Sequence, residues 1–156
     1  MYTIVEYNDI YDKKVKDLIT EVFIEEFEFE IYRDCIKDED IISEYLLNGG
    51  NFWIAIDEDN NVIGTIGAKA IEDKVLEIKR VYVKKECRGN GLSQKLFDIL
   101  ENFAIERGFE NLFLGTYDKF ERAIGFYLKN NFIEDESREK EEGIKYMSKC
   151  LVSVPA

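Results

Sequence analysis

The chain has 156 residues and a net charge of −12, and apolar residues make up 46% of it. This length and apolar content fit a single domain with a sizeable core, while the acidic balance argues against nucleic acid or an anionic membrane as a partner. The chain has no histidine and three widely spaced cysteines, which excludes a Ser–His or Cys–His catalytic site and gives neither a disulfide framework nor a zinc-binding spacing.

Apolar periodicity predicts the elements of the first half of the chain. In order, they are a strand over Thr3–Tyr7, helices over Asp12–Phe27 and Lys37–Leu47, and strands over Asn51–Ile56 and Val62–Ala70. The sequence Asn48-Gly49-Gly50 ends the second helix, and the polar turn 57–61 joins the last two strands into a hairpin.

The second half alternates strands and helices. Its predicted elements are a strand over Val75–Val83, an amphipathic helix over Gly91–Arg107, a strand over Asn111–Thr116, a helix over Phe120–Lys129, and strands over Phe132–Asp135 and Ile144–Leu151. The charged run Glu136–Glu142 reads as a solvated loop. The order β-αα-βββ-α-β-α-ββ predicts one α+β (mixed α/β) domain over residues 1–156, with a mixed sheet flanked by helices and a parallel strand–helix–strand unit.

The strand Val75–Val83 contains an irregularity in its apolar alternation. Leu76 and Ile78 alternate, as do Val81 and Val83, but three positions separate Ile78 from Val81. A β-bulge near Lys79–Arg80 shifts the phase in this way, and bulges are common beside active sites. A strand end buried on both faces is an equally good reading.

A glycine-bearing turn joins this strand to the long helix. It runs Val83-Lys84-Lys85-Glu86-Cys87-Arg88-Gly89-Asn90-Gly91-Leu92-Ser93. The unpaired amides of a helix N-terminus carry partial positive charge, and glycines let the backbone approach a phosphate, so the turn suits a pyrophosphate. The alternative is an ordinary glycine turn before a helix.

The turn resembles the acetyl-CoA signature R/Q-x-x-G-x-G/A of the GNAT superfamily, with Arg88, Gly91 and Ser93 at its fixed places. The family motif A-x-x-x-Y-x-x-x-G-F also has a counterpart in Ala123–Phe132, with Asn131 where Gly is usual. Phe120 stands where many members have an Asn that contacts the cofactor. The order of elements matches the GNAT-like fold over nearly the whole chain.

The resemblance implies an N-acetyltransferase that moves an acetyl group from acetyl-CoA to an amine by direct attack, without a covalent enzyme intermediate or a metal. It places the cofactor on the bulged strand and the turn, at Val81, Tyr82, Val83, Arg88, Gly89, Asn90, Gly91, Leu92 and Ser93. It assigns Tyr127 as the general acid and Glu77 as a candidate general base, with a backbone N–H near Val81 holding the carbonyl oxygen. A packing role for Tyr127 and an ordinary strand charge for Glu77 are the alternatives.

The acceptor is an amine of a small molecule or a peptide. The resemblance places the acidic aromatic segment Ile24–Arg33 and Trp53 where the family walls its acceptor cleft. This segment and the net charge favour a cationic acceptor. The alternatives are a solvated helix end for the segment and solubility alone for the net charge. A non-catalytic acyl-CoA-binding regulatory module is the alternative function. We expect a cytoplasmic monomer or homodimer, the latter through an exposed edge at Ile144–Val152.

Overall fold

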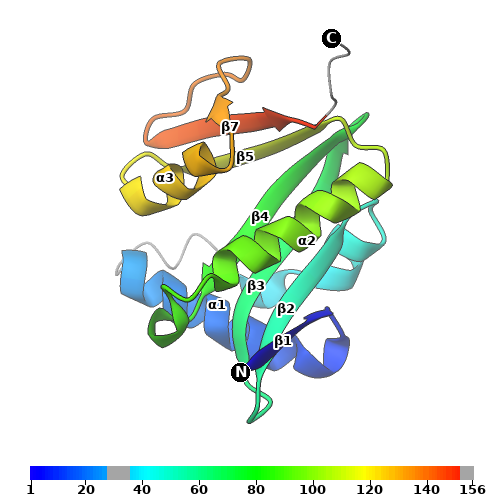
Figure 1. Cartoon of the computed structure of the whole chain (residues 1–156), viewed down its shortest axis with the longest axis vertical. Helices are drawn as coiled ribbons and strands as arrows, with labels where there is room; N and C mark the ends of the chain where they lie inside the picture. The colour runs from blue at the N-terminus through cyan, green and yellow to red at the C-terminus, as the bar shows by residue number, and fades with distance from the viewer. Residues whose placement is uncertain (28–35, 152–156) are drawn as a thin grey trace.

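The computed structural model describes residues 1–27 and 36–151, which form one mixed sheet of seven strands in the order β1-β2-β3-β4-β5-β7-β6 (Figure 1). The strands are β1 (Tyr2–Glu6), β2 (Asn51–Asp57), β3 (Val62–Glu72), β4 (Val75–Val83), β5 (Asn111–Tyr117), β6 (Ile133–Glu134) and β7 (Ile144–Cys150). Among the strands of the described residues, β4 and β5 alone pair in parallel, as the strand–helix–strand pattern predicted. The mixed α+β architecture is therefore confirmed.

The helices also follow the predicted order. They are α1 (Asp12–Phe27), α2 (Leu92–Glu106) and α3 (Glu121–Lys129), with the short helical turns η1 (Asp9–Tyr11), η3 (Ile36–Asp38), η4 (Ile42–Leu46) and η5 (Lys85–Cys87). The bounds of α1 and β4 match the prediction, and Gly91 and Arg107 are the caps of α2.

The helix predicted over Lys37–Leu47 is wrong. The chain forms the turn η3 and the single π-helical turn η4 instead. Asp40, between these turns, accepts from the backbone N–H of Ser43 in η4 at 3.2 Å, and the Glu39 carboxylate beside it accepts from Arg80 of β4. These tertiary and local contacts outweigh the helical periodicity of the segment.

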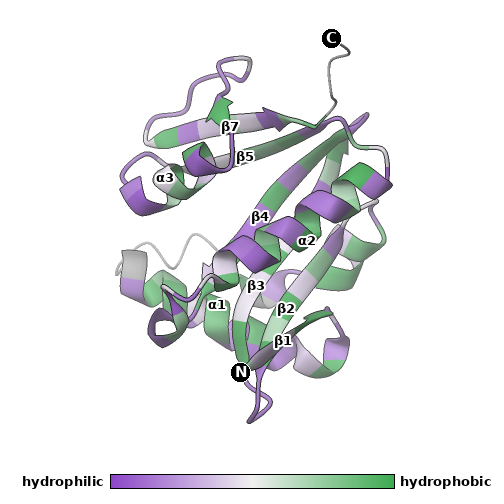
Figure 2. Ribbon diagram, in the orientation of Figure 1, coloured by the Kyte–Doolittle hydropathy of each residue, from purple (hydrophilic) through white to green (hydrophobic). Residues whose placement is uncertain are grey.

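Helices cover both faces of the sheet. On one face, α2 packs Leu96, Phe97 and Leu100 into the larger core cluster, to which α3 adds Tyr127. On the other face, α1 packs against Phe52 and neighbouring side chains. In Figure 1, α2 crosses in front of β2–β4 while α3 lies beside β5. Figure 2 shows hydrophilic residues in the turn between β2 and β3, in the loop between β6 and β7, and in parts of α2 and α3.

The sheet opens between β4 and β5. Their pairing covers only Val75–Glu77 against Asn111–Phe113, although β4 continues to Val83 and β5 to Tyr117. Figure 1 shows the two strands diverging beyond this junction. The second half of β4 therefore keeps a backbone edge that β5 does not occupy, which is the place where a ligand can pair with the strand.

The C-terminal strand differs from the prediction of an exposed edge. β7 lies between β5 and β6, and β6 pairs with it through Ile133 and Glu134, so part of its outer side is covered. No helix in residues 1–27 or 36–151 has the length and apolar character needed to cross a membrane.

Candidate active site

A β-bulge in β4 lies at the opening. Tyr82 is opposite Thr65 and Lys79 is opposite Gly67, so two residues of β4 face the single residue of β3 between these pairs. Arg80 has a φ of +57°, an uncommon conformation for a residue other than glycine. The predicted bulge is confirmed.

The bulge gives the next peptide a defined orientation. The hydroxyl of Thr65, which is fully buried, donates to the carbonyl oxygen of Arg80 at 2.7 Å. That carbonyl and the N–H of Val81 belong to one trans peptide and point in opposite directions. Because the carbonyl is directed to β3, the Val81 N–H is directed to the side on which β4 has parted from β5.

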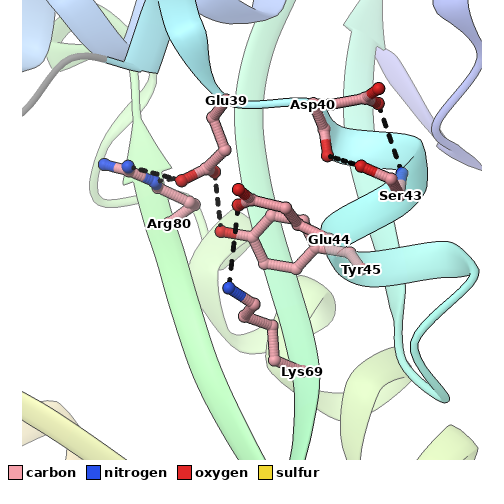
Figure 3. A network of polar contacts seen from close by, with 7 residues as sticks. All are labelled: Glu39, Asp40, Ser43, Glu44, Tyr45, Lys69 and Arg80. Carbon is pink, nitrogen blue, oxygen red and sulfur yellow. Dashed lines mark hydrogen bonds and ion pairs between the residues drawn. The ribbon is translucent and has the colours of Figure 1, made fainter.

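An ion pair fixes the side chain of the bulge residue (Figure 3). The Arg80 guanidinium lies 3.0 Å from a Glu39 carboxylate oxygen, and these side chains are only 8% and 13% exposed. The Tyr45 hydroxyl donates to the same carboxylate at 2.8 Å. Burial raises the pKa of Glu39, but hydrogen bonding and charge attraction from Arg80 outweigh it and leave that pKa lowered. Glu39 therefore stays ionised and holds Arg80 in an ion pair beside the bulge.

The loop after β4 forms a turn suited to an anion. Gly89 and Gly91 have φ values of +84° and +85°, and a Cβ added to either would meet no atom within 4 Å. Gly91 is the N-cap of α2, whose first amides have no partner within the helix. Asn90 accepts from the Leu92 N–H at 3.3 Å. The α2 N-terminus therefore offers amide donors beside open space, which is what a phosphate group requires.

Arg88 ties this loop to the end of β4. Its Nε donates to the Val83 carbonyl at 3.0 Å. The side chain is half-buried, so it orders the loop in addition to supplying charge. Lys84 and Lys85 precede it and add positive charge. With the open edge of β4, these features fit both the diphosphate and the amide-bearing arm of acetyl-CoA.

Tyr127 lies on α3 and packs in the core cluster that also contains the buried face of α2. It is 9% exposed, and its ring lies 5.5 Å from that of Phe132. Burial raises the pKa of Tyr127, and the nearby Tyr82 phenol raises it further. Tyr127 therefore stays a protonated phenol at neutral pH, as a general acid must be.

A pair of amide side chains connects α3 with α2. Gln94 donates to Asn130 at 2.8 Å, and Asn130 donates back at 3.1 Å. Asn130 also donates to the Phe126 carbonyl at 2.9 Å. This pairing fixes the end of the helix that carries Tyr127 relative to the helix that begins at the anion-binding turn.

Glu77 lies at the junction of β4 and β5, half-buried and paired with Phe113 on β5. Its neighbours Leu76 and Ile78 point into the core beneath α2, so the alternation of the strand directs Glu77 to the opposite face. Tyr127 packs in the α2 core. The two candidate groups therefore lie on opposite faces of the sheet.

Three expectations about the surroundings need correction or qualification. Trp53 does not wall the acceptor cleft, because it is 5% exposed and packs edge-on against Phe103 of α2. The acidic aromatic segment lies largely outside the described residues, which include Ile24 and Glu25 as exposed positions. Phe120, which replaces the family Asn, lies just before α3 with its ring 5.4 Å from that of Tyr117.

Two features of the site were not predicted. Arg138, in the loop expected to be solvated, forms an ion pair with Glu72 and lies 4.3 Å from the centre of the Phe113 ring. The contacts of Arg80 with Glu39 and Thr65 join residues 41 and 15 positions apart, and no local pattern encodes such distant pairs.

Among residues 1–27 and 36–151, no cluster of three or more His, Cys, Asp or Glu side chains could bind a metal.

A mixed sheet that parts after a bulged strand, with a glycine turn and a helix N-terminus at the opening, defines a GNAT-type acyl-CoA fold. The profile of the Acetyltransferase (GNAT) family matches residues 13–132. The chain belongs to this family.

Individual relatives agree with this assignment. Human N-acetyltransferase 8B is 33% identical over 99 residues, which cover 60% of this chain and 43% of that protein. Rat N-acetyltransferase 8F1 is 29% identical over 110 residues, covering 66% of this chain and 49% of the relative. The chain thus spans about half the length of these curated relatives or less.

A solved GNAT-family acetyltransferase from Staphylococcus aureus Mu50 superposes with a TM-score of 0.87 and 28% identity, covering 97% of this chain and all of the other. The solved fold therefore extends over nearly the whole chain, including the regions outside the family match.

Proposed function

We propose that this protein transfers an acetyl group from acetyl-CoA to an amine by direct attack. One observation carries the proposal: the Arg80–Val81 peptide is held by Thr65 so that its N–H faces the opening between β4 and β5. A positioned backbone donor at this place stabilises the oxygen on which negative charge develops when a thioester is attacked.

Each part of the site has a role in the reaction. Val81, Tyr82 and Val83 pair with the amide-bearing arm, while Arg88 to Ser93 bind the diphosphate at the α2 N-terminus. Acetyl-CoA is a co-substrate, and binding it here places the thioester carbonyl beside the Val81 N–H.

The bond changes balance without a covalent enzyme intermediate. The acceptor ammonium first gives one proton to Glu77, directly or through a water molecule. The neutral nitrogen attacks the carbonyl carbon, a C–N bond forms, and the C–S bond breaks. Tyr127 donates its proton to the departing thiolate, and its raised pKa keeps the phenol protonated at neutral pH. The second nitrogen proton returns to the phenol through solvent.

The opposite-face arrangement of Glu77 and Tyr127 supports this division of labour. A base on one face serves an amine that approaches from that side, and an acid in the α2 core serves the leaving group on the other. The acceptor class at this level is an amine of a small molecule or a peptide.

Calorimetric titration with acetyl-CoA tests the cofactor site, with Gly91→Glu as the matched variant. We expect micromolar binding by the parent and none by a still-folded Gly91→Glu. A folded parent that does not bind acetyl-CoA contradicts the proposal.

Thiol release with a panel of amines then tests transfer, with Tyr127→Phe as the second variant. Removing only the hydroxyl is expected to lower kcat by about 100-fold while acetyl-CoA affinity stays near that of the parent. Binding without thiol release from any amine would instead favour a non-catalytic acyl-CoA-binding module.

A further inference from the structure

Glu77 and Lys79 lie side by side on the acceptor face of the sheet. Both side chains are half-buried, and the two residues are two positions apart on β4. They alternate with the buried Leu76 and Ile78, which point to the other face of the sheet. Lys79 is opposite Gly67 on β3, which offers no side chain to pair with it. The pairing of β4 with β5 ends at Glu77, so Lys79 stands beside the opening.

The other charges around this pair already have partners. Lys69, directly across from Glu77 on β3, lies 3.6 Å from Glu44 and over the Tyr45 ring (Figure 3). Arg80 is bound to Glu39 on the same side. The pairing of Lys69 with Glu44 turns its ammonium from Glu77 towards η4.

Arg138, whose guanidinium covers the Phe113 ring, is likewise engaged by Glu72. In contrast, neither Glu77 nor Lys79 forms an ion pair with any side chain in residues 1–27 and 36–151. Both charges act on neighbours, because Lys79 helps to lower the pKa of Glu39 and Glu77 helps to raise the pKa of Tyr146. What these two half-buried side chains of opposite sign lack in that part of the chain is a partner at ion-pair distance.

We propose that Glu77 and Lys79 form a binding site for a zwitterion, so that the acceptor is an α-amino acid. The proposal rests on the acetyl-transfer function and specifies its substrate class. The amino acid's ammonium binds at Glu77, which receives its proton, and its carboxylate binds at Lys79. Alternate residues of a strand are about 6.6 Å apart along the chain, and charge-assisted hydrogen bonds of about 2.8 Å at each end leave room for an amine and a carboxylate on one carbon.

The local charges decide against a polycationic acceptor. A second positive group on the acceptor would meet Lys79, where like charges repel. The net charge of −12 attracts cations to the molecule as a whole, but the groups beside the reacting centre determine which amine is held in position. The site is therefore expected to select a zwitterionic acceptor, whereas the net charge of the whole chain favours a cationic one.

Matched acceptors test the proposal with the full chain. Thiol release is measured with saturating acetyl-CoA for phenylalanine, leucine, serine and glutamate, each compared with its α-amide and its decarboxylated amine, and for spermidine. The amide has a less basic nitrogen than the amino acid and the decarboxylated amine a more basic one, so a preference over both cannot come from basicity. We expect kcat/KM for at least one amino acid to exceed that for both analogues by about 10-fold or more, through KM, as for a hydrogen bond to a charged group.

Variants assign the preference to Lys79. Lys79→Met should raise KM for the amino acid by about 10- to 100-fold and bring its kcat/KM close to that of the amide, while Lys79→Arg should retain the preference. Lys69→Met, which removes a neighbouring charge already paired with Glu44, should leave the ratio as in the parent.

The outcomes separate the two proposals. Equal or better turnover of amines that lack the carboxylate overturns the zwitterion site and leaves acetyl transfer standing. A preference for amino acids that survives in Lys79→Met also overturns the role of this residue. Absence of thiol release with every acceptor, despite acetyl-CoA binding, overturns both acetyl transfer and the site that depends on it.

Discussion

Replacing Glu39 by glutamine tests whether the ion pair behind the bulge holds the site together. The change removes the charge that faces Arg80 but keeps an oxygen that can accept a hydrogen bond. Both side chains are nearly buried, at 13% and 8% exposure, so solvent replaces the lost partner poorly. Breaking a buried pair costs about 3–5 kcal/mol, and the retained acceptor reduces this to about 2–3 kcal/mol of the free energy of unfolding.

The pH dependence of this loss has a definite sign. The pKa of Glu39 lies below its ordinary value of 4.5 because Arg80 stabilises the carboxylate. A carboxylate whose pKa is lower in the folded state stabilises the protein above its unfolded-state pKa, and that contribution disappears as pH falls through the folded-state value. The difference between the parent and Glu39→Gln should therefore be complete at pH 7 and shrink below about pH 4.5.

Urea unfolding followed by fluorescence at pH 7 and at lower pH measures the effect. Glu44→Gln is the matched control, because Glu44 is 40% exposed and its ion pair with Lys69 is 3.6 Å long, for which we expect less than about 1 kcal/mol. If Glu39→Gln loses no more stability than Glu44→Gln, or if its loss is constant with pH, the reasoning is wrong.

Three further predictions follow from described contacts. Thr65→Val leaves the carbonyl of the bulge without its donor and should cost about 1–3 kcal/mol in urea unfolding, with a lower kcat at similar acetyl-CoA affinity. Gly67→Ala places a Cβ 2.9 Å from the Tyr45 ring and should lower Tm through about 1–3 kcal/mol of overpacking, whereas Gly125→Ala, with open space in α3, should raise it. Since burial raises the pKa of Tyr127, kcat should show no decline from its ionisation between pH 7 and 9.5; a decline absent from Tyr127→Phe would contradict this.

Local patterns predicted most of the fold because their physical causes are local. The phase shift between Ile78 and Val81 encoded the bulge, and the glycines before α2 encoded a turn with positive φ. The segment Lys37–Leu47 failed because Glu39 serves a distant partner and Asp40 caps a short turn. Helical spacing there reflects burial of Ile41 and Tyr45, not a continuous helix.

The site shows the same division between local and distant causes. Motif positions placed Glu77 on a strand, Tyr127 on a helix and the loop before a helix, and the structure has β4, α3 and the start of α2 there. Their roles stay predictions. Trp53 was assigned to the wrong side because its hairpin position does not reveal which sheet face is covered by which helix. The covering of Phe113 by Arg138 depends on how a long loop folds back, and composition says nothing about that.

Only three residue pairs join β4 to β5, so a short stretch of backbone pairing connects strands β1–β4 to the rest of the sheet. The amide-bearing arm of acetyl-CoA, if paired with the free edge of β4, would form the backbone hydrogen bonds that β5 does not form there. Ligand at 100 times its dissociation constant adds about 2.7 kcal/mol to the stability of the form that binds it. The fraction of the protein that is folded would then rise with the concentration of acetyl-CoA, so the acetyl donor would contribute to the stability of the fold as well as to the reaction.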